Sequence, residues 1–165
     1  NNVSTSTNNI AIGFGAQVAV AGNSHQIKMG DGRITLAQTQ VGWTLSSDRR
    51  FKSNIQNSQL GLDFIKTLRP VSYTRTIDDY KKTEYGFIAQ ELEEALVNAG
   101  DSNNGIIVKD DAGMYGVRYN DFIPMTVKAV QEQQVLIEKL QKDNEELKAT
   151  NAAILKRLDA LEKRQ

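Results

Sequence analysis

Ser47 and Lys52 are the two residues of this sequence whose types and spacing can do chemistry. A serine hydroxyl is a weak nucleophile at neutral pH, and a lysine activates it as a general base only when the amine is neutral. Burial and nearby positive charge both favour that neutral form. Residues five apart lie on opposite faces of a strand and far apart around a helix, so the two side chains can meet only across a turn or between subunits.

The arginines between them have two interpretations. Arg49 and Arg50 carry positive charge that would help keep Lys52 neutral. Charged side chains are seldom buried unless paired, so pairing of these arginines with carboxylates such as Glu84 or Glu91 is an equal alternative.

A reacting carbonyl also needs donors for its oxyanion, and two groups are candidates. These are the backbone amides near Asn54 and the side chain of Gln90. Gln90 and Glu91 also have an ordinary role, because a glutamate favours the first turn of a helix. Ser47 and Asp48 would likewise cap a short helix in an arbitrary protein.

The bond that Ser47 would attack has two possible positions. Attack on its own following carbonyl, between Ser47 and Asp48, closes a strained four-membered ring and so requires a neighbouring chain or an activated water. Attack on the preceding carbonyl, between Ser46 and Ser47, passes through an easier five-membered ring.

Composition excludes several classes of site and partner. The chain has 20 basic and 20 acidic residues, so its net charge indicates neither nucleic-acid binding nor membrane attachment. It has no cysteine and one histidine, His25, so no metal site and no cofactor are expected. With no apolar run long enough for a membrane helix and no signal peptide, the chain is expected to be a soluble fragment of a longer protein.

The first 46 residues have the composition of a glycine-rich fibre. They hold half of the twelve glycines, and their apolar residues alternate in short runs, which is typical of strands. Such short strands cannot bury a core within one chain, so they are expected to stack on one another or on copies from other subunits. The predicted strands are 10–12, 18–20, 27–29 and 34–36.

Residues 47–122 have the mixed composition of a small α+β domain. A helix that begins near Leu60 is expected to end before Pro70. A second helix is predicted over 89–98, with Gly100 as its stop. The segments 106–108 and 115–119 are predicted to form a β-hairpin.

The last region, 123–165, predicts a long coiled-coil helix. It contains no glycine and keeps a heptad pattern for about five repeats, and a lone helix cannot bury that seam, so we expect a parallel homo-oligomer. Asparagines at two a positions set register, and the pattern leaves the number of strands open. The a positions are Ile123, Val130, Ile137, Asn144, Asn151 and Leu158, and the d positions are Thr126, Gln133, Leu140, Leu147, Ile154 and Leu161.

Four motifs resemble one family in residues, order and spacing. The first runs from Ser47 to Ile55 and has the form Ser-Asp-x-Arg-x-Lys followed by Asn-Ile; the others are 68–73, 86–93 and 117–124. Together they resemble the intramolecular chaperone auto-processing domain of phage endosialidases, tail spikes, tail fibres and neck appendages, also present in the myelin regulatory factor group. The resemblance covers about residues 46–140.

The resemblance implies a homotrimer that helps an upstream β-structured fibre to fold and is then cut off between Ser47 and Asp48. Ser47 would be the nucleophile and Lys52 the general base, with Arg50, Asn54, Gln90 and Glu91 as possible supporting residues. Residues 1–46 would be the C-terminal end of the client, the fibre that the domain folds. The implied partners are copies of the chain and its own upstream segment, without nucleic acid or membrane.

The resemblance also implies a place of action and leaves two alternatives. Assembly would occur in the host cell cytoplasm, with the client part in the phage virion and the chaperone part released. One alternative is a structural trimerisation module of a phage fibre or bacterial adhesin that keeps the motif without cutting. The other is a membrane-tethered transcription factor, which the glycine-rich segment fits less well.

Overall fold

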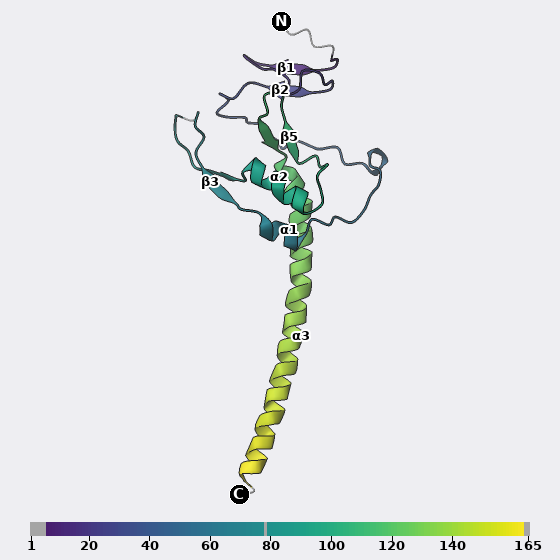
Figure 1. Cartoon of the computed structure of the whole chain (residues 1–165), viewed down its shortest axis with the longest axis vertical. Coiled ribbons are helices and arrows are strands. Elements are labelled where there is room, and N and C mark those ends of the chain that lie inside the picture. Colours follow the sequence, from purple (N-terminus) through teal and green to yellow (C-terminus); the bar gives the residue numbers. More distant parts are fainter. Residues whose placement is uncertain (1–5, 78, 164–165) are drawn as a thin grey trace. The chain divides into compact units, whose positions relative to one another are not determined.

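The computed structural model describes residues 6–77 and 79–163. Within them the chain is mixed α/β, with small two-stranded sheets and one long helix at its C-terminal end, as Figure 1 shows. This mixture of short strands with a long final helix confirms the expected class. Residues 1–5 and 164–165, at the outer ends of the first and last predicted regions, lie outside the described residues.

The described chain forms two compact units. Of the described residues, the first unit joins 6–57 with 67–77 and 79–121, and the second joins Ser58–Lys66 with 122–163. The predicted division at residues 46 and 122 is based on composition and stays a prediction.

Two of the predicted fibre strands pair in parallel. They are β1 (Ile10–Ile12) and β2 (Ile27–Met29), and Ile10 lies opposite Ile27. The backbone continues this contact at the end of the strands, where the N–H of Gly30 donates to the carbonyl of Ile12 at 2.8 Å. A parallel pair joined by one connection is the arrangement of successive coils in a solenoid.

The strands predicted at 18–20 and 34–36 are wrong, because neither segment is a strand in the structure. Val20 shows a physical reason. Its N–H donates to the side-chain oxygen of Gln26 at 3.0 Å, and its carbonyl accepts from the side-chain nitrogen of Gln26 at 2.7 Å. One side chain thereby satisfies both backbone groups that a strand ladder would have used.

The two parallel strands belong to consecutive coils that repeat at a spacing of 17 residues. Asn8 and His25 both have positive φ, at 59° and 65°, and their side-chain nitrogens Nδ2 and Nδ1 lie 2.9 Å apart across this spacing. Gly13 and Gly30 also have positive φ, at 107° and 65°. The two coils therefore have positive-φ residues at these two equivalent positions, and Asn8 and His25 lie side by side.

One face of this small sheet is apolar and uncovered. Alternate residues of a strand share a face, so Ile10, Ile12, Ile27 and Met29 form one apolar column. Each of these four side chains is between 47 % and 65 % exposed. The column is the kind of surface expected for a strand region that takes its burial from elsewhere.

The middle of the chain holds two antiparallel pairs. β3 (Val71–Tyr73) pairs with β4 (Glu84–Gly86), and β5 (Ile107–Lys109) pairs with β6 (Tyr115–Val117). The second pair confirms the predicted hairpin. Asp110 holds its turn, because its carboxylate oxygen Oδ1 accepts hydrogen bonds from two backbone N–H groups at 3.0 and 2.8 Å.

The helix α2 (Ala89–Asn98) has the bounds that the sequence predicts. Gly100 ends it with φ 83°, and its N–H donates to the carbonyl of Val97 at 2.9 Å. The inward face is buried: Leu92 is 2 % exposed and Leu96 is fully buried. These leucines are the best-buried side chains of the first unit and fix the face that α2 turns inward.

The second unit contains α1 (Leu62–Thr67) and the first turns of α3 (Phe122–Glu162). Glu132 joins them, because its Oε2 accepts a hydrogen bond from the backbone N–H of Leu62 at 2.6 Å. Lys128, one helical turn before, pairs with the same carboxylate at 2.7 Å. The buried side chains of this unit are Leu60, Phe64, Phe122, Met125 and Ala129.

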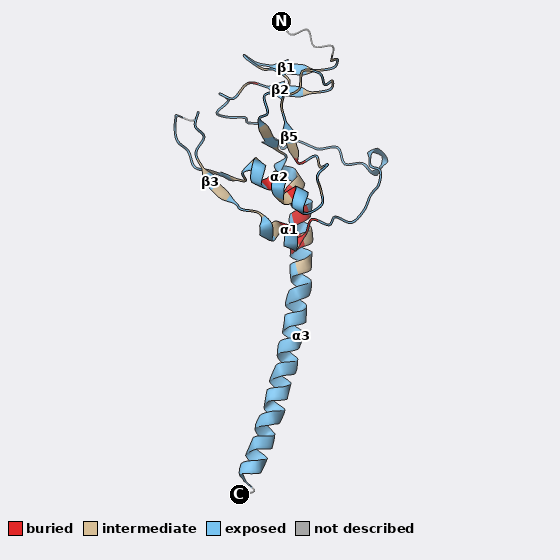
Figure 2. Cartoon of the chain, in the orientation of Figure 1, coloured by how far each residue is buried: buried red, intermediate tan, exposed pale blue. Residues whose placement is uncertain are grey.

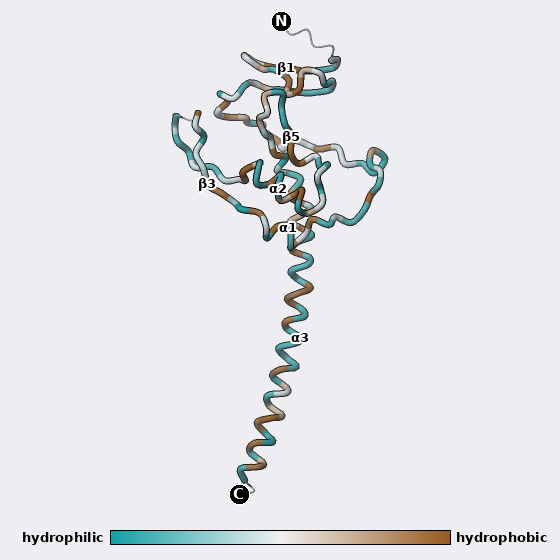
Figure 3. The backbone as a smooth tube through the Cα atoms, in the orientation of Figure 1, coloured by the Kyte–Doolittle hydropathy of each residue, from teal (hydrophilic) through white to brown (hydrophobic). Residues whose placement is uncertain are grey.

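The rest of α3 is exposed on all sides. Every residue from 133 to 163 is exposed, and the whole helix of 41 residues is about 60 Å long. Figure 2 shows this as an unbroken pale blue helix, and Figure 3 shows apolar bands recurring along it. The later d positions, Leu140, Leu147, Ile154 and Leu161, are 49 % to 66 % exposed. The described chain therefore leaves the predicted coiled-coil seam uncovered.

Candidate active site

Ser47 and Lys52 meet across a turn within one chain. The Nζ of Lys52 donates a hydrogen bond to the Oγ of Ser47 at 2.6 Å. Of the two arrangements that the five-residue spacing allows, the structure has the turn. A second subunit is therefore not needed to bring these two atoms together.

The turn is a short 3-10 helix, η1 (Arg49–Phe51), which reverses the chain between the two side chains. The N–H of Phe51 donates to the carbonyl of Asp48 at 3.1 Å, and the N–H of Lys52 donates to the carbonyl of Arg49 at 3.0 Å. Asp48 is its N-cap, because the carboxylate oxygen Oδ1 accepts from the N–H of Arg50 at 2.8 Å. The capping role weighed for Asp48 and the meeting of Ser47 with Lys52 are therefore parts of one structure.

Asp48 also binds the side chain of Arg50. The guanidinium donates from Nε to Oδ1 at 3.0 Å and from Nη2 to Oδ2 at 2.8 Å, a two-pronged pair. This hydrogen bonding holds the pKa of Asp48 below its usual range and raises that of Arg50. The expectation that Arg50 pairs with Glu84 or Glu91 is wrong in its partner, since those two glutamates bind Arg75 and Arg69. The charge of Arg50 is thus balanced within the turn by Asp48.

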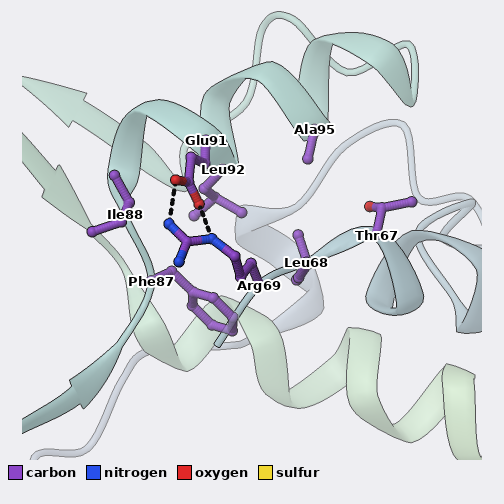
Figure 4. A pocket seen from close by; sticks show the side chains of 8 residues that line it. All are labelled: Thr67, Leu68, Arg69, Phe87, Ile88, Glu91, Leu92 and Ala95. Atoms are coloured by element: carbon purple, nitrogen blue, oxygen red, sulfur yellow. Dashed lines mark hydrogen bonds and ion pairs between the residues drawn. The ribbon is translucent and has the colours of Figure 1, made fainter. Parts of the chain in front are cut away.

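Glu91 serves a different contact from the one considered for it. Its Oε2 and Oε1 accept from Nε and Nη2 of Arg69 at 3.0 and 2.5 Å, as the dashed lines in Figure 4 show. The hydrogen bond from Arg69 holds the pKa of Glu91 below its usual range. This pair ties the second motif to the third, and thereby the chain before β3 to the first turn of α2.

The third and fourth motifs also meet. The hydroxyl of Tyr119 accepts a hydrogen bond from the N–H of Phe87 at 3.0 Å, and the two rings stack with centroids 6.1 Å apart. Gly86 allows this approach, because a Cβ at that position would collide with the Tyr119 hydroxyl. Three motifs that are far apart in the sequence are therefore joined by named contacts in one unit.

The supporting candidates Asn54 and Gln90 lie exposed, Asn54 with φ 51° and Gln90 on the first turn of α2. No hydrogen bond of the described residues joins Asn54, Gln90 or Glu91 to Ser47 or Lys52. Their roles in catalysis stay predictions.

Among the hollows in the described part of the first unit are a small one and a larger one, and neither is lined by Ser47 or Lys52. The one in Figure 4, of about 40 Å³, lies beside the Arg69–Glu91 pair and has room for water-sized molecules only. The larger one, of about 550 Å³, is lined by residues 32–37 together with Arg75, Ile77, Tyr80, Lys82 and Glu84. Neither hollow therefore provides a preformed pocket beside the Ser47–Lys52 pair.

Lys52 Nζ and Ser47 Oγ are close enough for proton transfer, but both side chains are exposed to solvent. Heavy atoms 2.6 Å apart can exchange a proton directly. Both side chains are exposed in the single chain, and lysine acts as a base in the neutral form that burial favours. The described chain therefore supplies the nucleophile and its partner without the enclosure in which such pairs work.

The described residues were also compared with the requirements of a metal site and of a membrane-spanning helix. They contain no group of three or more side chains suited to hold a metal ion. Among them, no helix combines the length and apolarity that crossing a bilayer demands.

Comparison with known proteins gives one match. Residues 47–101, about one third of the chain, match the model of a peptidase family described as the chaperone of endosialidase. A search of curated proteins found no match. The matched segment begins at Ser47, includes Lys52, η1 and α2, and ends just after Gly100. Over residues 47–101 the match therefore confirms the resemblance to the intramolecular chaperone auto-processing family that the sequence motifs indicate.

Proposed function

We propose that this chain is a C-terminal intramolecular chaperone that trimerises, promotes the folding and assembly of an upstream β-fibre, and then releases itself by cutting at Ser47–Asp48. The observation that carries the proposal is the 2.6 Å hydrogen bond between Lys52 Nζ and Ser47 Oγ at the first residue of the matched family segment. A serine beside an amine that can take its proton is the minimum for a serine nucleophile.

The proposed chemistry is an acyl transfer followed by hydrolysis. Lys52 takes the proton of the Ser47 hydroxyl, and Oγ forms an ester with the carbonyl carbon of Ser47 in a neighbouring chain. The bond from that carbon to the nitrogen of Asp48 breaks, and the new amino group receives the proton held by Lys52. Water then opens the ester and yields a carboxylic acid on the client and a free amine on the chaperone. Attack by a water that Lys52 activates leads to the same two products.

The alternative cut uses the chain's own Ser46 carbonyl. Oγ of Ser47 attacks it through a five-membered ring, the peptide bond becomes an ester, and water hydrolyses that ester. The new chaperone N-terminus is then Ser47 in place of Asp48, so the mass of the products distinguishes the two routes.

Assembly of three copies would supply what the single chain lacks. The exposed seam of α3 is the surface on which a parallel coiled coil forms. Joining the chains there raises the local concentration of their fibre segments and aligns them. The same assembly would enclose the exposed Ser47–Lys52 pair, so cutting would follow association.

The client would be residues 1–46 and the fibre before them. Fibres built from several chains form slowly and expose strand edges while they form, and a tether shortens that stage. Release afterwards leaves a fibre held by a high unfolding barrier. We place the assembly in the host cell cytoplasm and the client part in a phage tail.

Mass measured over time tests the function. The purified 18.3 kDa chain should divide into two fragments whose masses sum to that of the chain plus one water, while Ser47→Ala and Lys52→Ala stay whole. Sedimentation of the uncut Ser47→Ala chain should give a trimer. A wild-type trimer that stays whole on prolonged incubation would contradict self-cleavage and leave the chaperone role.

A second candidate is a trimerisation module that does not cut. The exposure of Ser47 and Lys52 in the single chain favours it, because a Ser–Lys pair that cuts is expected to be enclosed. It predicts a stable trimer with no fragments under any condition.

A further inference from the structure

The structure forms two coils of the repeat, and a segment that resembles the strand of a third coil lies directly before Ser47. Each formed strand has two apolar residues around a middle one and is followed by a glycine with positive φ: β1 by Gly13 and β2 by Gly30. The residues 43–46 have the same pattern, Trp-Thr-Leu-Ser, with serine in the glycine position. They begin 16 residues after Ile27, close to the spacing of 17 between the first two coils.

In the structure this segment belongs to no strand. Residues 40–47 contain no strand, and Trp43 and Leu45 are 74 % and 64 % exposed. Within the described residues, β2 pairs only with β1, so its other edge carries no strand. An open strand edge and a matching free segment of the same chain are complementary, because a parallel rung would satisfy the backbone groups of both.

We propose that residues 43–45 add to the open edge of β2 as a third rung, and that seating this rung readies the Ser47 site for cutting. In the matching register Trp43 lies beside Ile27 and Leu45 beside Met29, on the face that carries the apolar column. Thr44 lies beside Lys28 on the opposite face. The rung extends the column by two large side chains that are otherwise in water.

The rung fixes the chain directly before the nucleophile. Ser46 then occupies the turn position of Gly13 and Gly30, and Ser47 follows it between a bonded rung and the η1 turn. With both sides held, the peptide bonds at Ser46–Ser47 and Ser47–Asp48 have a defined position relative to Lys52, as a near-attack geometry requires. Cutting thus waits for the last coil of the client to fold. This coupling rests on the proposed function; the rung itself does not.

Disulfide trapping tests the rung without any cleavage. The chain has no cysteine, so Lys28→Cys with Thr44→Cys, in a Ser47→Ala background, introduces one pair. Neighbouring strands lie about 4.8 Å apart, a separation that a disulfide accepts. Ala11→Cys with Lys28→Cys, which are register partners, is the positive control, and Lys28→Cys with Thr39→Cys is the negative one.

We expect the 28–44 pair to oxidise within one chain to at least half the extent of the 11–28 pair, seen as a monomer of altered mobility on a non-reducing gel. Crosslinked dimers or trimers would overturn the proposal, because the rung would then come from another copy. Failure of the 28–44 pair while the 11–28 pair forms would overturn it as well.

Trp43, the single tryptophan, gives a second readout, and proline tests the coupling. Thr44→Pro removes a backbone N–H from the middle of the proposed rung, while Gln38→Pro lies in the connection and is the matched control. We expect Thr44→Pro to remove a blue shift of the Trp43 emission and to slow cutting at least tenfold, with Gln38→Pro unchanged. A Thr44→Pro chain that cuts at the wild-type rate contradicts the coupling. Crosslinking of the 28–44 pair, together with a wild-type chain that never cuts, contradicts only the proposed function.

Discussion

Lys52 reaches Ser47 because Asp48 caps the turn between them, so the 2.6 Å contact of Nζ with Oγ depends on a residue that touches neither atom. The base role predicts that Lys52→Arg abolishes cutting, since an arginine keeps its proton and cannot accept one. We expect a loss of at least a hundredfold, followed as the fraction of whole chain over time. Lys142→Arg, on the exposed part of α3, is the control and should cut normally.

Asp48 has two functions that substitutions can separate. Asp48→Asn keeps an oxygen for the N–H of Arg50 and loses the charge of the ion pair, whereas Asp48→Ala loses both. We expect cutting to slow about threefold for the first and at least tenfold for the second, because the turn forms less often. Circular dichroism should show unchanged helix content in both variants. Equal rates for Asp48→Ala and the wild type would remove Asp48 from the positioning of Lys52.

The acid sensitivity of the fold follows from three paired glutamates. Hydrogen bonds from Arg69, Lys109 and Lys128 hold the pKa values of Glu91, Glu93 and Glu132 below the usual range. The unfolded chain then binds more protons at low pH, so stability that is fully present above about pH 4.5 is lost as pH falls through the folded-state values. The urea midpoint should be flat from about pH 6 to 8 and fall below about pH 4.5.

Substitution of one of these glutamates shows how much that carboxylate contributes to the loss of stability in acid. Glu132→Gln should make the fall of the urea midpoint in acid smaller, because one carboxylate no longer has to be protonated on unfolding. Glu145→Gln, on the exposed part of α3, is the matched control. An unchanged acid profile in Glu132→Gln would show that this carboxylate does not hold α1 to α3.

The contact between the third and fourth motifs makes Gly86 sensitive to any side chain. Gly86→Ala would push a methyl group into the Tyr119 hydroxyl and break its bond with the N–H of Phe87. We expect a loss of about 2 kcal/mol in the free energy of unfolding, typical of overpacking. Gly22→Ala has open space at its Cβ and should cost much less, as thermal unfolding of both variants can measure.

The seam of α3 predicts the assembly. Leu147→Lys places a charge at a d position, whereas Ala149→Lys places the same charge at f, on the outside. Sedimentation should show dissociation for the first and an intact trimer for the second. Replacement of both Asn144 and Asn151 by isoleucine should stabilise the assembly and relax its strand number. A trimer that persists in Leu147→Lys would contradict the heptad register.

Local signals predicted the helices better than the fibre strands. Helix α2 and its stop at Gly100 follow from an apolar face and a left-handed glycine, both of which a short window of sequence contains. The segment 18–20 alternates like a strand, but a side chain from Gln26 takes its backbone groups, and such competition is not visible in periodicity. The repeat itself was visible: residues 8–15 and 25–32 share a polar pair, two apolar residues around a middle one, and two glycines.

The candidate site divides in the same way. The residue types and spacing of Ser47 and Lys52 predicted that they meet across a turn or between subunits, and the structure has the turn. The partner of Arg50 was missed because it lies two residues away, and an Asp-x-Arg sequence that begins a capped turn is the signal that could have found it. The contact of Glu132 with Leu62 spans 70 residues, and no local pattern predicts it.

The position of the η1 turn gives the proposed cut a consequence for the cell. A break between Ser47 and Asp48 separates the hydroxyl from the amine and removes the chain that precedes the cap. The freed chaperone keeps Lys52 and loses its nucleophile, so it cannot attack the fibre it has left or any other protein. Each cut releases one chaperone copy from one chain, so the amount of freed chaperone is proportional to the number of completed fibres.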